Sequence, residues 1–181
     1  MASITIDDDL LLRNYTPEDA PGLFAAVDAS RKHLHPWLSW VDKTTKEEHS
    51  LQYIQDSLYG PYTKEALVLG IFYRETIIGG IGMHNWNHNT KCAQIGYWIG
   101  KGHEGKGIIN KCLTAFVPYL FDKIGLNKIE IHFMPDNKRS AKVAQRLGFK
   151  TEGIIRQSII HNGMPQDVVI AGLLKSEWPT L

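Results

Sequence analysis

The sequence has little cysteine, no long apolar run and almost no excess of charge. Its two cysteines, Cys92 and Cys112, fall in an expected strand and an expected helix, without the close spacing of metal ligands. We interpret both as free thiols of a reducing compartment. No stretch approaches the roughly 20 apolar residues of a membrane span, and no signal-peptide pattern opens the chain. This predicts a cytoplasmic protein without a membrane partner.

The charge balance and the length exclude further classes. The 20 basic and 19 acidic residues leave a formal net charge of +1, so no global field favours nucleic acid as a partner. The acids at residues 7–9 come without a further set of ligands, so we expect a solvated turn there and no metal site. A chain of 181 residues without a linker-like stretch predicts a single domain, residues 1–181.

The most informative stretch is an apolar, strand-like run at residues 92–99 that breaks into a glycine-rich loop. A helical pattern starts directly after the loop, at Ile108. The loop contains four glycines within eight residues, Gly100, Gly102, Gly105 and Gly107. Glycine has no Cβ atom to keep a ligand off the backbone, and the first amides of a helix have no partner within it. The pattern predicts an anion site, most often for phosphate.

Three known loop patterns compete for this stretch. Gly-x-Gly-x-x-Gly from Gly100 fits the dinucleotide fingerprint, but that motif normally follows an opening strand, and its acid about 20 residues on would be Asp122 or Glu130. A P-loop needs Ser or Thr for Mg²⁺ where this chain has Gly107, which argues against metal-assisted nucleotide hydrolysis. The third pattern is the acyl-CoA pyrophosphate loop of the GNAT acetyltransferases, Gln/Arg-x-x-Gly-x-Gly/Ala. Residues 104–109 resemble it, with Glu first and Ile last.

A second motif downstream decides between these patterns. Residues 136–153 read as an Asn that opens a helix, then Gly148-Phe149 and Glu152-Gly153, and this resembles the second GNAT signature. The Ile-Gly-Tyr-Trp strand at residues 95–98 and the Asn-x-x-Ser helix at Asn137 are similar to the ribosomal-protein N-terminal acetyltransferases, the Rim branch. The resemblance covers nearly the whole chain, residues 10–178.

The expected elements form a mixed α/β (α+β) layer. Strand patterns cover residues 4–13, 66–73, 76–85, 91–99, 128–134, 153–160 and 168–174, and helical patterns cover residues 16–32, 45–61, 108–123 and 137–148. Thr16 and a capping box from Thr45 to Glu48 are expected to start the first two helices, and Pro118 to bend the third. The resemblance implies a mostly antiparallel sheet, flanked by helices, that splays at one parallel contact.

The resemblance also implies acetyl-CoA as the co-substrate, without a metal. Main-chain groups of Tyr97, Trp98 and Ile99 would pair with its pantetheine arm, as an added strand pairs with a sheet. The pyrophosphate would lie on Gly105, Lys106, Gly107, Ile108, Ile109 and Asn110, because phosphates favour a helix N-terminus. Asn137 would cap its helix, bind the cofactor or do both.

The implied reaction is direct transfer of an acetyl group to a primary amine. It needs a neutral amine, a stabilised oxyanion and a proton for the leaving thiolate. By resemblance Ser140 is placed to protonate the thiolate, and Ala144 stands where many other GNAT enzymes have a tyrosine for this task. A solvent-facing hydroxyl on the first turns of a helix is the alternative interpretation of Ser140.

The motifs define the residues that would bind the acceptor amine less well than those that would bind the cofactor. By resemblance the segment with Trp37 and Trp40 walls the acceptor pocket, although packing between helices is an equal alternative. His84, at a strand end, is a further pocket residue or a structural histidine. Rim-type relatives have a Glu where this chain has Ile159, and several have a carboxylate where it has Gln94. The remaining candidates for a base are His35, His84, His161 and an ordered water, and we expect no dedicated base.

The resemblance implies an N-acetyltransferase that acts on a protein N-terminal α-amino group, as in ribosomal-protein acetylation. Such an amine has a pKa of about 7.7–8.0, against about 10.4 for lysine, so a weak base suffices. The alternatives are a small-molecule amine, such as a polyamine, an amino acid or an antibiotic, and a non-catalytic CoA-binding regulatory protein. Rim-type relatives commonly associate, so a homo-oligomer is compatible with the resemblance.

Overall fold

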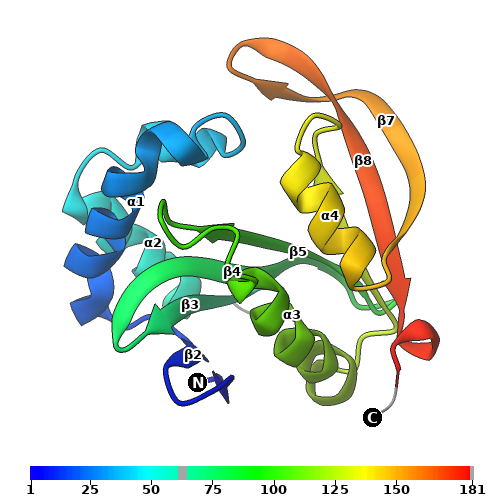
Figure 1. Cartoon of the computed structure of the whole chain (residues 1–181), viewed down its shortest axis with the longest axis horizontal. Coiled ribbons are helices and arrows are strands. Elements are labelled where there is room, and N and C mark those ends of the chain that lie inside the picture. The colour runs from blue at the N-terminus through cyan, green and yellow to red at the C-terminus, as the bar shows by residue number, and fades with distance from the viewer. Residues whose placement is uncertain (61–64, 180–181) are drawn as a thin grey trace.

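The computed structural model describes residues 1–60 and 65–179. Within them one sheet has the strand order β1-β2-β3-β4-β5-β6-β8-β7 (Figure 1). The strands are β1 (Ser3–Thr5), β2 (Leu10–Arg13), β3 (Leu67–Tyr73), β4 (Thr76–Asn87), β5 (Cys92–Ile99), β6 (Lys128–Phe133), β7 (Lys150–His161) and β8 (Met164–Leu174). The helices are α1 (Ala20–Leu34), α2 (Glu47–Tyr59), α3 (Ile108–Tyr119) and α4 (Lys138–Arg146). None of the helices described is long and apolar enough to cross a membrane.

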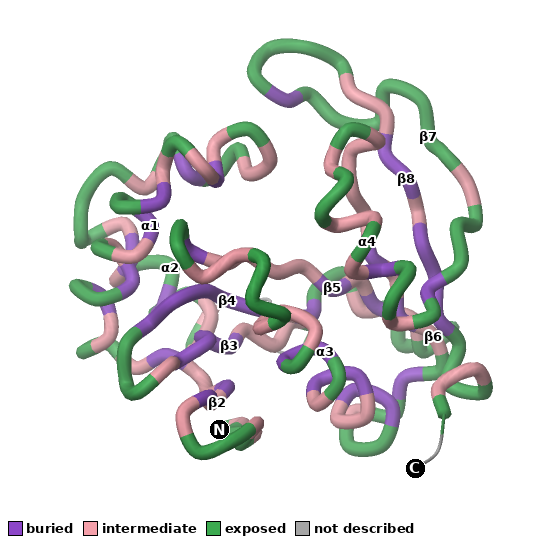
Figure 2. The backbone as a smooth tube through the Cα atoms, viewed as in Figure 1, coloured by how far each residue is buried: buried purple, intermediate pink, exposed green. Residues whose placement is uncertain are grey.

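The sheet lies between two pairs of helices. Helices α1 and α2 cover one face and α3 and α4 the other (Figure 1). Successive side chains of a strand point to opposite faces, and β5 shows this alternation. Its Ala93, Ile95 and Tyr97 belong to the core under α3, whereas Trp98 packs with the α1–α2 side. The central strands are buried, while β7, at the edge, is exposed along most of its length (Figure 2).

The only parallel pair in the described sheet is β5 with β6, as the resemblance implied. The two strands pair at Cys92–Lys128, Ala93–Ile129 and Gln94–Glu130 and nowhere beyond. β5 continues to Ile99 and β6 to Phe133, so the two strands part after the third pair. This opens a gap in the middle of the sheet, and both the glycine loop and α4 follow the strands that border it.

Several element boundaries differ from the sequence expectation. The first expected strand is a hairpin of β1 and β2, and β7 and β8 are each longer than their patterns. The expected capping box at Thr45 is wrong, because the N-cap of α2 is Lys46 and the Thr45 amide instead donates to Nδ1 of His49. Pro118 lies inside α3, which passes into a π-helical segment, Leu120–Ile124. Gly60 caps α2, and the expected stop at Pro61 falls outside the described residues.

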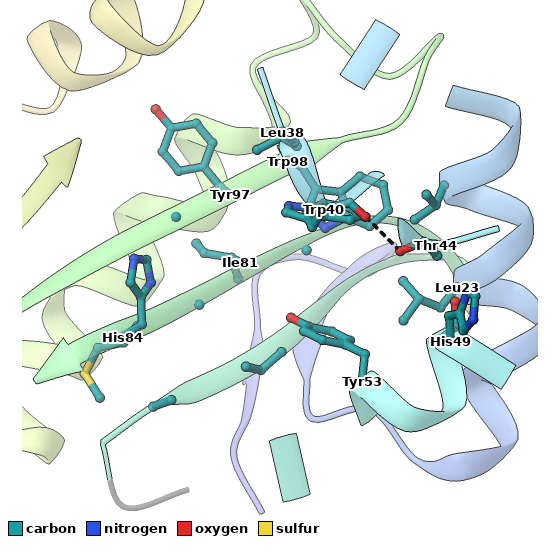
Figure 3. Close-up of a pocket in the computed structure, with 18 residues that line it drawn as sticks. Leu23, Leu38, Trp40, Thr44, His49, Tyr53, Ile81, His84, Tyr97 and Trp98 are labelled. Carbon is teal, nitrogen blue, oxygen red and sulfur yellow. Dashed lines mark hydrogen bonds between the residues drawn. The ribbon is translucent and has the colours of Figure 1, made fainter. Parts of the chain in front are cut away.

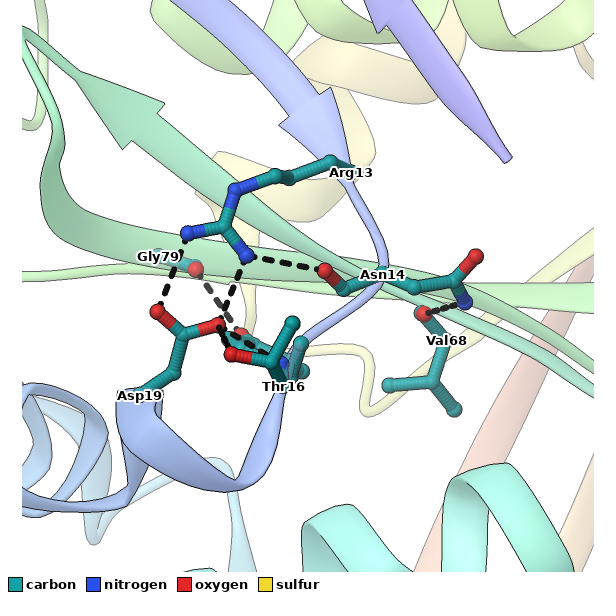
Figure 4. A network of polar contacts seen from close by, with 7 residues as sticks. Arg13, Asn14, Thr16, Asp19, Val68 and Gly79 are labelled. Atoms are coloured by element: carbon teal, nitrogen blue, oxygen red, sulfur yellow. Dashed lines mark hydrogen bonds and ion pairs between the residues drawn. The ribbon is translucent and has the colours of Figure 1, made fainter. Parts of the chain in front are cut away.

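A polar network joins β2 to the start of α1 (Figure 4). Arg13 donates to both carboxylate oxygens of Asp19, at 2.7 and 3.0 Å, and its guanidinium lies 3.7 Å from the centre of the Phe72 ring. The Thr16 amide also donates to Asp19, at 2.7 Å. Burial raises the pKa of Asp19, but the bonds from Arg13 and Thr16 outweigh it, so the net pKa is below its usual value. The ionised carboxylate therefore fixes the entry to α1.

We predict that Asp19→Asn lowers the free energy of unfolding by about 1–2 kcal/mol at pH 7, because it removes a charge-assisted pair with two bonds. A carboxylate with a lowered folded-state pKa stabilises above about pH 4, and this contribution is lost as the pH falls through the folded pKa. The difference between wild type and variant should therefore shrink at pH 3. Urea unfolding at both pH values measures it, and Asp28→Asn, in an exposed pair with Arg31, is the control. An equal difference at both pH values would contradict the role of the charge.

Candidate active site

A cavity of about 700 Å³ occupies the gap between β5 and β6. It is bordered by β5, the glycine loop, the start of α3, the end of β6 and one side of α4. Most residues expected from the sequence meet here, namely Trp37, Tyr97, Trp98, Ile99, Gly105, Gly107, Ile108, Ile109, Asn110, Asn137 and Ser140. Lys106 is exposed and does not line the cavity, and Trp40 and His84 line a neighbouring one.

The glycine loop presents bare backbone to this cavity. Gly105 and Gly107 have φ values of 75° and 74°, which residues with a side chain rarely adopt. A Cβ atom built on either glycine would meet nothing within 4 Å, so the space beside the backbone is open. Gly107 is also the N-cap of α3, whose first amides have no partner within the helix. The loop is therefore a cradle that a phosphate group can enter.

Three cations on α4 face the same cavity and were missed by sequence reasoning. Arg139, Lys142 and Arg146 all line it. Their spacing of three and then four residues places them on one face of a helix, and this spacing was the signal that could have found them. Glu104 also lines the cavity and accepts a bond of 2.5 Å from the Gly102 amide, which holds the loop. The cationic side chains outnumber the single carboxylate of this lining, so the charge of the cavity is net positive and suits an anionic group.

Ser140 lies on the first turn of α4, which covers the same face of the sheet as α3. Its amide donates to Oδ1 of Asn137 at 3.1 Å, which makes Asn137 the cap of this helix. The Tyr97 hydroxyl is buried without a hydrogen-bond partner among the described residues. Burial raises the pKa of Tyr97 to about 12, and the nearby Ser140 hydroxyl opposes this rise without reaching hydrogen-bond geometry. A buried phenol without a partner thus lies beside the serine, although the position at which the resemblance implied a tyrosine is Ala144.

A second cavity of about 510 Å³ lies on the α1–α2 side of the sheet (Figure 3). It shares Leu38, Gly96, Tyr97 and Trp98 with the first cavity, so the two meet at β5. Trp40 packs edge-on against Trp98 with ring centres 6.0 Å apart. Trp40 therefore packs and walls the second cavity, while Trp37 lines the first. The two tryptophans of one segment are divided between the two cavities.

The histidines proposed as bases are not equivalent. His84 lines the second cavity, where a Cβ on Gly96 would lie 3.4 Å from its Cε1 atom. Its ring reaches solvent, yet partial burial lowers its pKa, and nearby His132 lowers it further. His35 is paired with Asp42 at 3.2 Å, and His161 is buried at the tip of the β7–β8 hairpin. Neither of these two lines either cavity.

The two positions at which the resemblance implied carboxylates lie at the site. Gln94 and Ile159 both line the first cavity. His132, on β6, lines it as well and was not considered from the sequence. Lys128, Glu130 and His132 alternate with apolar residues along β6, and that alternation of ionisable groups was the available signal.

A sheet that splays at one parallel pair, with an open glycine cradle at the edge of the gap, defines an acyl-CoA-dependent transferase. A family model described as "Acetyltransferase (GNAT) domain" matches residues 9–150. The chain therefore belongs to the GNAT acetyltransferase family. It is an N-acetyltransferase that uses acetyl-CoA, which supplies the acetyl group as a thioester.

Known relatives include two ribosomal-protein enzymes of Escherichia coli (strain K12). The chain is 31% identical over 188 residues to the [ribosomal protein uS5]-alanine N-acetyltransferase, and this alignment covers 94% of this chain and 90% of that protein. It is 27% identical over 166 residues to the ribosomal-protein-serine acetyltransferase, with 92% and 93% covered. Among solved structures, the microcin C7 self-immunity acetyltransferase MccE in complex with acetyl-CoA and AMP matches with a TM-score of 0.87, 26% identity and 93% and 94% covered.

We predict that Gly107→Val lowers the affinity for CoA about tenfold or more, because its side chain would fill the cradle beside the backbone. Isothermal calorimetry on the folded variant measures this. Gly163→Val is the matched control, since Gly163 has a φ of 75° in the β7–β8 turn, so that valine there meets the same backbone strain without lining the cavity. Equal affinities in wild type and Gly107→Val would show that the loop does not hold the phosphates.

Proposed function

We propose that the enzyme acetylates the N-terminal α-amino group of a protein, with a ribosomal protein as the acceptor. The names of the two Escherichia coli relatives support this class, and a ribosomal protein as acceptor is consistent with a reaction in the cytoplasm. The observation that carries the proposal is the chemistry of the second cavity. None of its described lining residues is Asp, Glu, Lys or Arg.

A lining without charge discriminates between acceptors. A polyamine carries further ammonium groups, and burying these without carboxylate partners is costly. A peptide that enters with its N-terminus carries neutral amides and one side chain behind the reacting amine. The cavity offers Trp40, Tyr53 and Trp98 to such a side chain. Its volume of about 510 Å³ accommodates one large residue or two small ones.

An amine that carries a planar aromatic ring is the second candidate. The MccE structure contains AMP, and the cavity of this chain has an aromatic lining on which a ring can stack. For polyamines and aminoglycosides, the described lining offers no carboxylate that could pair with their ammonium groups.

Within the proposed reaction Ser140 donates the proton that the leaving thiolate needs. Its hydroxyl is held over the gap because Asn137 caps the helix that carries it. The Tyr97 phenol, whose pKa burial raises to about 12, lies beside it and adds a second hydroxyl to the same side of the gap. The main chain of Tyr97 to Ile99, which β6 leaves unpaired, is proposed to orient the thioester.

We predict that the acceptor preference follows this lining. Purified enzyme with acetyl-CoA should release free thiol with peptides whose N-terminal residue is apolar, less with tryptamine, and only at background with spermidine. Tyr53→Glu places a carboxylate at the half-exposed mouth of the cavity and should raise turnover of spermidine, whereas Tyr59→Glu, exposed on the same helix, should not. Turnover with spermidine that exceeds all peptides in the wild type would contradict the proposed function.

We predict that Ser140→Ala lowers kcat about 10²-fold with little change in the KM for acetyl-CoA, because the proton donation occurs in the transition state. Steady-state kinetics with a saturating peptide measure it. Ser57→Ala, a helix hydroxyl on α2 that binds the Ile54 carbonyl, is the control. A loss confined to KM would make Ser140 a binding residue instead.

A further inference from the structure

A row of ionisable side chains on β6 has no role in the reaction described so far. Ile129 and Ile131 point into the core under α3 and α4. The residues between and beside them, Lys128, Glu130 and His132, therefore point to the opposite face of the sheet. This is the face of α1, α2 and the second cavity, from which the proposed acceptor approaches.

The register of the sheet places His132 at the gap. β5 and β6 pair up to Gln94–Glu130 and then part. If the pairing continued for two more residues, Gly96 would stand opposite His132. Gly96 is one of the few residues that line both cavities, and His132 lines the first together with Ser140. The imidazole therefore borders the gap at the point where the two cavities meet.

Glu130 holds this imidazole. Nε2 of His132 lies 2.8 Å from Oε2 of Glu130, and the side chains are 25% and 18% exposed. Lys128 donates to the other oxygen of Glu130, also at 2.8 Å. Burial raises the pKa of Glu130, but Lys128 and His132 outweigh it, so the net pKa is lowered and the carboxylate stays ionised. An ionised partner fixes the tautomer with a proton on Nε2, which leaves the lone pair on Nδ1. Nδ1 has no hydrogen bond to the described residues.

We propose that His132, oriented by Glu130, is the general base that deprotonates the acceptor ammonium. The inference rests on the proposed function, in that it assigns the base of the same transfer. Nδ1 takes one proton from the ammonium, and the freed nitrogen lone pair forms the C–N bond at the thioester carbon while the C–S bond breaks. Ser140 gives its proton to the thiolate, and the second amine proton restores the serine through solvent. One ammonium and one thioester thus yield one amide, one thiol and one proton, which His132 releases.

The arrangement places the base and the acid on opposite faces of the sheet. Ser140 and Tyr97 lie on the α3–α4 side, where the thiolate departs, and His132 lies on the side of the acceptor. The ionisable groups that face His132 are Glu130 and Lys128 on β6 and His84 on β4, with Glu152 of β7 bound to Lys128. His84 is the competing base, but it has no carboxylate partner among the described residues. This assignment replaces the expectation that the reaction proceeds without a dedicated base.

The test compares kcat/KM from pH 5.5 to 9.5 in wild type, His132→Gln, Glu130→Gln and His35→Gln. His35→Gln is a matched control because His35 also pairs with a carboxylate, Asp42, but lines neither cavity. At pH 7, His132→Gln should lose about 10²-fold or more. The loss should shrink above the pKa of the amine, where the acceptor no longer needs a base. Glu130→Gln should lose less, and its loss should fall on kcat and not on the KM for acetyl-CoA, since the imidazole loses the carboxylate that orients it. His35→Gln should match wild type.

Two results would overturn the proposal. One is an unchanged kcat/KM in His132→Gln, and the other is a loss of the same factor at every pH, which indicates a structural role. The affinity for CoA, measured by calorimetry, should be equal in all four proteins and confirms that the variants are folded. If wild type acetylates no peptide but only another amine, the proposed function fails, and the same pH comparison with that amine still decides the role of His132.

Discussion

The site depends on one constraint, the early end of the only parallel pairing in the described sheet. β5 and β6 share three residue pairs and then part, which leaves the main chain of β5 unpaired from Ile95 to Ile99 on that side. Unpaired backbone groups in a protein interior need partners. The gap therefore suits an extended amide chain, and we propose that the pantetheine arm of acetyl-CoA fills it. The glycine cradle and α4 are placed by the strands that border this gap.

The gap also divides the chemistry between two faces. Cationic side chains and the cradle gather on the side of α3 and α4 together with Ser140, and we propose that this side takes the phosphates of the co-substrate. The opposite face has an uncharged aromatic cavity and the His132–Glu130 pair. A reaction that joins two substrates through the plane of the sheet can place proton removal on one face and proton delivery on the other. The two steps then do not compete for the same groups.

The sequence predicted the parts that local chemistry determines. The glycine loop and the Asn137 cap each depend on a few consecutive residues, and the structure has them where expected. Prediction from the sequence failed where several elements of the fold meet. Trp37 and Trp40, for example, were divided between two cavities. The capping box at Thr45 is a local exception, because the Thr45 amide donates to His49 in the first turns of the same helix. His132 was missed because its position at the gap follows from where β5 and β6 stop pairing, which no local pattern encodes.

The most direct test is a crystal structure with a bisubstrate analogue, in which the CoA sulfur is joined through an acetyl linker to the N-terminal amine of a peptide. We predict that the pantetheine amides pair with the main chain of Tyr97 to Ile99 and that the sulfur lies beside Ser140. The peptide nitrogen should lie beside His132, with the first side chain in the aromatic cavity. A pantetheine arm outside the gap, or a peptide on the α3–α4 face, would contradict this account.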